Sequence, residues 1–134
     1  MNYWLIKSEP GTYSWDDLVN DKETIWDGVR NYQARNHLKS MKKGDQAFFY
    51  HSGEGKEIVG IATVTGEHFP DPGDKDWVAV RVSAKKPLKN PVTLAQIKSD
   101  KRLTDMVLVK SSRLSVQPVL PKEFEMILKL SEST

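Results

Sequence analysis

The sequence predicts an α+β domain built on a strongly curved mixed sheet or small barrel. Five or six segments carry the apolar, β-branched and aromatic residues typical of strands, and short helical patterns are interleaved with them. Most links between successive strands are too short for the crossovers of a parallel sheet. The length of 134 residues fits one domain over residues 1–134.

The first predicted elements are a buried strand and a short helix. Residues 3–6 form an apolar run, and Pro and Gly within residues 8–11 force a turn after it. Ser14 can cap the helix that follows, because Asp17 stands three residues later as an approximate capping box.

A second helix is predicted over residues 32–41, with Asn31 as its cap. Ala34, Leu38 and Met41 recur at the spacing of one helix face, which is expected to face the core. Another face carries basic residues and is expected to point outward: Arg35, Lys39 and Lys42.

Three strands are predicted in the middle of the chain. Residues 46–51 are apolar on both faces, which indicates a central strand. A hairpin turn at 52–55 leads into a second strand over 58–65, and residues 77–83 alternate as a third. Residues 69–76 are rich in Pro, Gly and Asp and are expected to form a loop too polar to pack.

The last third of the chain is predicted to mix helices and short strands. Thr93 can cap a helix that ends near Ile97, and residues 106–109 and 114–119 resemble strands. Pro121 suits the first turn of a final helix. The apolar residues of that helix are expected to face inward: Phe124, Ile127 and Leu128.

The composition favours a cytoplasmic protein without membrane contact. The chain has no cysteine, which excludes disulfides and thiolate metal ligands and fits a reducing compartment. Residues 1–10 lack the basic start and long apolar run of a signal peptide. No stretch approaches the roughly 20 apolar residues of a membrane span.

Charge is distributed unevenly although the net charge is only +2. Residues 1–27 contain six acids and two bases, whereas residues 28–43 contain five bases and no acid. Residues 81–113 contain nine bases and two acids. Solvated helix and turn faces account for such lysines individually, so these basic stretches indicate a polyanion partner only together with other features.

Residues 26–52 concentrate side chains that can hold a nucleic-acid base. Aromatic rings stack on bases, amides bond base edges and arginines neutralise phosphate. Trp4 and Trp15 are expected to fill the core, whereas Trp26 adjoins an Asp-Gly turn signal and is a candidate stacking platform in a loop. The relevant residues are Trp26, Arg30, Asn31, Tyr32, Gln33, Arg35, Asn36, Phe49, Tyr50 and His51.

Signatures of catalysis and metal binding are weak. The glycine-rich residues 52–56 lack the spacing of a phosphate loop and suit a hairpin turn. The three histidines show no metal-ligand spacing, and no nucleophile stands beside a base in a known motif. We therefore expect no catalytic residue, no metal and no cofactor.

The chain resembles the EVE domain family, a branch of the PUA-like superfamily that also holds the YTH, ASCH and SRA-type modules. The similarity spans about residues 3 to 120. The matching blocks are residues 3–5 (YWL), 7–10 (KSEP), Trp26, 28–36 (GVRNYQARN), Met41, 44–45 (GD), 48–52 (FFYHS), 59–60 (VG), Trp77 and 113–119 (RLSVQPV).

This resemblance implies a PUA-like twisted pseudo-barrel of five or six strands flanked by short helices. It also implies a pocket for a modified, often methylated, base of DNA or RNA. The expected pocket residues are Ser8, Trp26, Val29, Arg30, Asn31, Tyr32, Phe49, Tyr50 and His51. The expected phosphate contacts are Lys7, Arg35, Lys39, Lys43 and Arg113.

Two other functions remain open on the sequence alone. One is an enzyme that acts on a small nucleotide-like ligand, with His51 as general base. The other is an interaction domain whose groove takes a peptide. Binding that weakens steeply with salt favours the nucleic-acid reader, whereas turnover lost on His51→Ala favours the enzyme.

Overall fold

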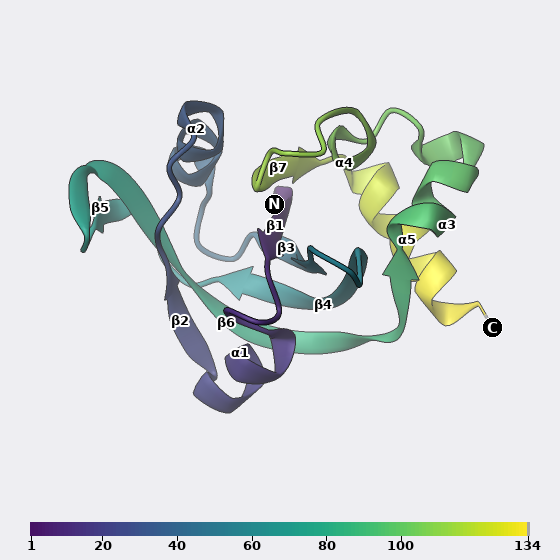
Figure 1. The fold of residues 1–134 in the computed structure, drawn as a ribbon, viewed down its shortest axis with the longest axis horizontal. Helices are drawn as coiled ribbons and strands as arrows, with labels where there is room; N and C mark the ends of the chain where they lie inside the picture. The colour runs from purple at the N-terminus through teal and green to yellow at the C-terminus, as the bar shows by residue number, and fades with distance from the viewer. Residues whose placement is uncertain (134) are drawn as a thin grey trace.

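The structure is a computed structural model that describes residues 1–133, and it contains a seven-stranded mixed sheet with short helices around it (Figure 1). The strands are β1 (Tyr3–Ser8), β2 (Glu23–Trp26), β3 (Gln46–His51), β4 (Glu57–Val64), β5 (Phe69–Asp71), β6 (Asp74–Thr93) and β7 (Val116–Val119). The helical segments are α1 (Trp15–Asp21), α2 (Tyr32–Ser40), α3 (Leu94–Ser99), the 3₁₀ turn η1 (Lys101–Leu103), α4 (Val107–Lys110) and α5 (Pro121–Glu132).

The sheet runs in the order β2-β6-β4-β3-β1-β7, and β5 pairs with β6 outside this path. Strands β1 and β3 run parallel, with Tyr3 opposite Gln46 and Ser8 opposite His51. Residues 9–45 connect them through α1, β2 and α2, which is long enough for a parallel crossover. The predicted α+β class is confirmed, with seven strands instead of five or six.

Strand β6 curves across the molecule from β5 to α3 (Figure 1). The ladder between β4 and β6 shifts register between Ile58 and Gly60 and again between Ile61 and Ala62, and such bulges increase bend and twist. A Cβ added at Gly60 would lie 2.6 Å from the ring of Trp15. Glycine therefore lets α1 pack closely on the curved part of the sheet.

Apolar side chains cover both faces of the sheet. Along β3, Ala47 and Phe49 contact the core cluster under α1 and α2, whereas Phe48 and Tyr50 contact the cluster under α3, α4 and α5. This alternation explains why the strand reads as apolar throughout.

No helix within residues 1–133 has both the length and the apolar character needed to cross a membrane.

The helix starts follow the sequence-based prediction. The Ser14 side chain accepts from the Asp17 N–H at 3.1 Å, and the Asp17 carboxylate accepts from the Ser14 N–H at 2.9 Å. The Asn31 side chain accepts from the Ala34 N–H at 2.9 Å and caps α2. Thr93 caps α3 in the same way as Ser14 caps α1.

The strand predicted over residues 77–83 is the longer β6, Asp74–Thr93. Three other segments differ in kind from the prediction. Residues 106–109 were expected to form a strand, but the structure places 107–110 in α4, because a short apolar run fits either structure and helical bonds satisfy its backbone here. Residues 69–76 were expected to be an unpacked loop, yet they contain β5 and the buried Asp71. Strand β2 is an addition, so Trp26 ends a strand instead of lying in a loop.

Candidate functional site

A cavity of about 490 Å³ opens between the β1–α1 turn and the β2–α2 loop. Its volume lies in the usual range for sites that bind small molecules or single bases. It is lined by Lys7, Ser8, Glu9, Thr12 and Tyr13 from the first segment, by residues 24–30 from the second, and by Ser115 before β7.

One wall of the cavity is the end of β1. The Ser8 hydroxyl donates to the Tyr13 carbonyl, which leaves the Ser8 oxygen free to accept a hydrogen bond. The Lys7 ammonium donates to the Ser112 carbonyl at 2.6 Å, and the Lys7 N–H donates to the Ser115 carbonyl at 2.9 Å. Burial lowers the pKa of Lys7. This wall is therefore anchored to the loop before β7.

A second part of the cavity wall is formed by Trp26, the last residue of β2. The rings of Tyr13 and Phe49 lie nearly perpendicular to its indole, with centroids 6.3 Å and 5.5 Å away. Phe49 is fully buried, whereas Trp26 is only partly buried and lines the cavity. The indole is thus held by the buried Phe49 ring and by Tyr13, which also lines the cavity, and presents part of its surface to a ligand.

Asp71 fixes the loop that follows Trp26. Its Oδ2 atom accepts from the Gly28 N–H at 2.9 Å and from the Arg30 guanidinium at 3.0 Å, and its Oδ1 accepts from the Gly73 N–H at 2.7 Å. Gly28 has φ +75°, a conformation that glycine adopts without strain. The hydrogen bond from Arg30 lowers the pKa of Asp71 to about 2, against the opposing effect of burial, and the two glycine N–H groups add to it.

The charges around the cavity are balanced. Two cations, Lys7 and Arg30, stand among its lining residues with two acids, Glu9 and Asp27. The rest of the lining is uncharged and consists of Ser8, Thr12, Tyr13, Thr24, Ile25, Trp26, Gly28, Val29 and Ser115. This combination suits a flat, uncharged ring with polar edges better than a free anion.

The structure brings four of the nine predicted pocket residues into the cavity: Ser8, Trp26, Val29 and Arg30. The other five predicted positions lie outside the lining of this cavity. Asn31 is occupied in capping α2, and Tyr32 is 68% exposed on the first turn of that helix. Phe49 and Tyr50 are buried on opposite faces of the sheet. His51 accepts a hydrogen bond at Nε2 from the first N–H of α1 at 3.0 Å.

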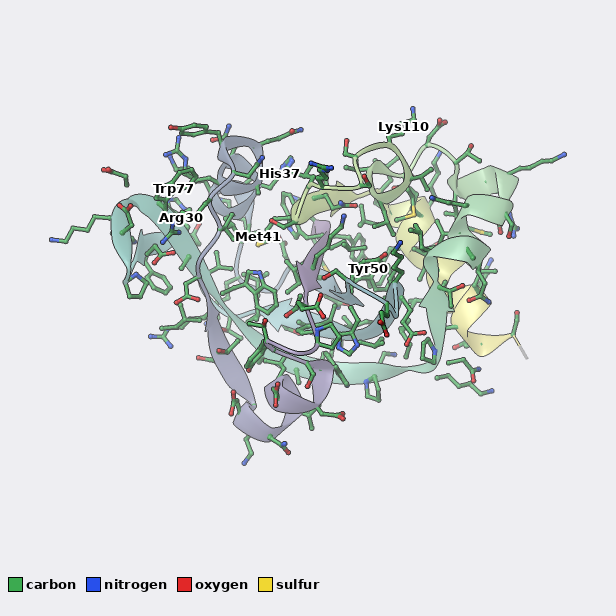
Figure 2. The ribbon with its side chains drawn as sticks, in the orientation of Figure 1. Arg30, His37, Met41, Tyr50, Trp77 and Lys110 are labelled. Atoms are coloured by element: carbon green, nitrogen blue, oxygen red, sulfur yellow. The ribbon has the colours of Figure 1, made fainter. Side chains whose placement is uncertain are left out.

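The five predicted phosphate contacts differ in their surroundings. Lys7 lies in the cavity wall. The centre of the Arg35 guanidinium lies 4.8 Å from the Tyr32 ring and 5.2 Å from the Trp77 ring, and Arg35 also donates to the Asp76 carbonyl at 3.0 Å. Figure 2 shows Trp77 beside Arg30 near β5. The remaining three are exposed: Lys39, Lys43 and Arg113.

Sequence reasoning missed several residues of the site, chiefly Tyr13, Thr24, Ser115 and Asp71. Tyr13 immediately precedes a helix cap, where an apolar residue often packs on the helix, and this is the signal that could have found it. Asp71 stands between two prolines, a pattern that predicts only a turn.

Within residues 1–133, no group of three His, Cys, Asp or Glu residues could hold a metal ion.

The curved mixed sheet, the helices on both faces and the cavity between two loops define a small α+β binding module. More specifically, the chain belongs to the EVE domain family, because the EVE domain model matches residues 2–130.

Similar proteins cover nearly the whole chain. Thymocyte nuclear protein 1 from Homo sapiens is 36% identical over 98% of this chain and 74% of its own length. The NMR structure of Rpa0253 from Rhodopseudomonas palustris is 51% identical, with a TM-score of 0.94 over 98% of this chain and 93% of the other. The crystal structure of human THYN1 in complex with DNA containing 5-methylcytosine is 35% identical, with a TM-score of 0.93 over 100% and 99%.

Proposed function

We propose that this protein is a non-enzymatic nucleic-acid-binding module that holds a modified base, most simply a methylated one, of DNA or RNA in the cavity beside Trp26. The observation that carries the proposal is the similarity to human THYN1, whose crystal structure contains DNA with 5-methylcytosine and which matches this chain over its whole length. The cavity described above gives such a base a place to bind.

The physical properties of the cavity support a base as its occupant. A base that leaves a duplex loses a few kcal/mol of stacking and pairing, and an aromatic platform such as Trp26 returns about 1–3 kcal/mol. The Ser8 oxygen and backbone groups of residues 24–30 can bond the base edge. A methyl group that contacts apolar atoms adds about 0.8 kcal/mol, or about a fourfold preference for the modified base.

The environment of His51 argues against the enzyme alternative. Burial lowers the pKa of His51, although nearby acids oppose this effect. Its Nε2 atom already accepts the Trp15 N–H, and His51 is absent from the cavity lining. A general base needs a free acceptor nitrogen within reach of its substrate. His51 therefore fits a structural role, as a cap on α1.

The peptide-groove alternative has little support from the surface. Only four large apolar side chains are exposed within residues 1–133: Met1, Val19, Tyr32 and Leu120. Val19 lies on α1 and Tyr32 on α2. A groove for an apolar peptide needs a larger contiguous set of such side chains.

A binding screen tests the proposal. Labelled oligonucleotides with one cytosine or 5-methylcytosine, and with adenine or N6-methyladenine, are titrated in single-stranded and duplex form as DNA and as RNA. We expect at least one modified form to bind about fourfold tighter than its unmodified counterpart. Equal affinities for every pair would contradict the proposal. Mass spectrometry of the same samples tests for turnover, and multiple-turnover product that is lost in His51→Ala would favour the enzyme.

A further inference from the structure

A second cavity of about 360 Å³ lies beside the first. One side is formed by Asn31 and Gln33 at the start of α2, and the other by residues 110–114 of the loop between α4 and β7. In Figure 2, Lys110 lies at the edge of the molecule that also carries α2.

The two cavities continue along the same pair of chain segments. Residues 24–30 line the first cavity, and Asn31 and Gln33 line the second. On the other side, Ser115 lines the first cavity and residues 110–114 line the second. Lys7 connects them, because it lines the first cavity while its ammonium donates to the Ser112 carbonyl in the wall of the second at 2.6 Å. A strand whose base enters the first cavity can therefore pass over the second.

The cavities differ in charge. The first has two cations and two acids among its lining residues, whereas the second has two cations, Lys110 and Arg113, and no acid. The second lining also contains two serine hydroxyls and two side-chain amides, which can donate hydrogen bonds, and Leu114. This chemistry is that of a phosphate site, because arginine, lysine and hydroxyl groups are the usual donors to phosphate oxygens.

One acid stands close to this group. The Asp105 carboxylate lies 3.2 Å from the Lys110 ammonium, and both side chains are largely exposed. An exposed ion pair of this kind contributes about 0–1 kcal/mol. Lys110 can therefore exchange it for a phosphate at little cost, while Arg113 has no acid within ion-pair distance among residues 1–133.

We propose that the second cavity is a phosphodiester site, which holds a backbone phosphate of the strand whose modified base occupies the first cavity. The inference rests on the proposed function in one respect, because that function supplies the nucleic-acid strand to which the phosphate belongs. The anion-binding property itself belongs to Lys110, Arg113 and the hydroxyls beside them.

A direct test uses dimethyl phosphate, the simplest phosphodiester, and the amide NMR spectrum of the protein. Saturable shifts are expected at residues 110–114 and 31–33, beyond those caused by sodium chloride at equal ionic strength. They should be lost in Lys110→Gln/Arg113→Gln and kept in the control Lys98→Gln/Lys129→Gln, which removes two charges on α3 and α5. No saturable shift in these segments, or equal shifts in both variants, would overturn the site whether or not nucleic acid binds.

A second test places the phosphate within the strand. Each phosphodiester of a short methylated oligonucleotide is replaced in turn by an uncharged methylphosphonate. For one linkage beside the modified base we expect about a tenfold loss of affinity with the parent protein and no further loss with Lys110→Gln/Arg113→Gln. The site would be contradicted if, at every linkage, the methylphosphonate and the double substitution lowered the affinity independently, so that their fold-losses multiplied. Failure of the proposed function would give a different result. Methylated and unmethylated oligonucleotides would then bind the parent protein with equal affinity, whichever linkage is replaced.

Discussion

The Arg30 guanidinium donates to the Asp71 carboxylate at 3.0 Å across 41 residues of sequence, and this contact ties the loop after Trp26 to strand β5. The same carboxylate oxygen also accepts the Gly28 N–H. Asp71 thereby holds both the backbone and the cationic side chain of one cavity wall. The shape of the candidate site consequently depends on a residue that does not line it.

Asp71 should make the stability of the protein depend on pH in the acid range. Its pKa falls from 3.8 to about 2 on folding, so its contribution is fully present above pH 3.8 and is lost as the pH falls through about 2. We expect about 1–2 kcal/mol, since Arg30 is 41% exposed and water screens the pair. Urea denaturation at several pH values should show the parent more stable than Asp71→Asn at pH 7 and nearly equal at pH 2.

The exposed pair of Glu67 and Lys42 provides the control for this titration. Glu67→Gln should change stability by less than about 1 kcal/mol at any pH. A stability difference between parent and Asp71→Asn that stays constant from pH 7 to pH 2 would show that the carboxylate charge has no special role.

Gly60→Ala should destabilise the protein by about 1–3 kcal/mol, because the new Cβ would lie 2.6 Å from the Trp15 ring inside a packed core. Gly66→Ala is the matched control, since nothing lies within 4 Å of a Cβ at that position. Urea denaturation of both variants measures the difference. Equal stability of the two variants would mean that the ring can move away from β4 freely.

His51→Ala should cost about 1–3 kcal/mol of stability, because the Trp15 N–H loses its acceptor. His51→Gln, which can supply a side-chain oxygen, should recover part of this loss, and His68→Ala at an exposed position should have no effect. Thermal denaturation gives these values. On the folded fraction, oligonucleotide affinity should be unchanged in His51→Ala, and a selective loss of affinity would return His51 to the binding site.

Lys39→Gln/Lys43→Gln should weaken binding equally for modified and unmodified strands, because phosphate contacts do not read bases. With single strands, the slope of log K against log salt should flatten by about 0.7 for each lysine that no longer neutralises a phosphate. Arg35 is kept in this test because its stacking on Tyr32 and Trp77 ties it to the fold. An unchanged slope would identify the two lysines as a solvated helix face.

Local patterns predicted most of the fold. The caps at Ser14, Asn31 and Thr93 depend on residues within one helical turn, so the sequence contains all the information they need. Strand β3 was recognisable because core clusters lie on both of its faces. Segment 106–109 was misread because four apolar residues do not reveal their period.

Contacts between distant loops were beyond such reasoning. Nothing near Asp71 in the sequence indicates that Gly28 and Arg30 donate to it, because those partners are brought close only by the pairing of β5 and β2 with β6. Trp26 and Arg30, which the composition of residues 26–52 singled out, both line the first cavity. The same composition includes Phe49 and Tyr50, whose side chains the structure buries on opposite faces of β3.

If a base stacks beside Trp26, the variant Trp26→Ala must bind a methylated oligonucleotide more weakly than the parent protein does. The variant should lose about 1–3 kcal/mol of binding, Trp26→Phe should lose less, and Trp77→Ala, which removes an indole outside the cavity, should keep the preference for the methylated base. Circular dichroism confirms that each variant is folded. A folded Trp26→Ala protein that binds methylated and unmethylated strands as the parent does would show that no base stacks on Trp26.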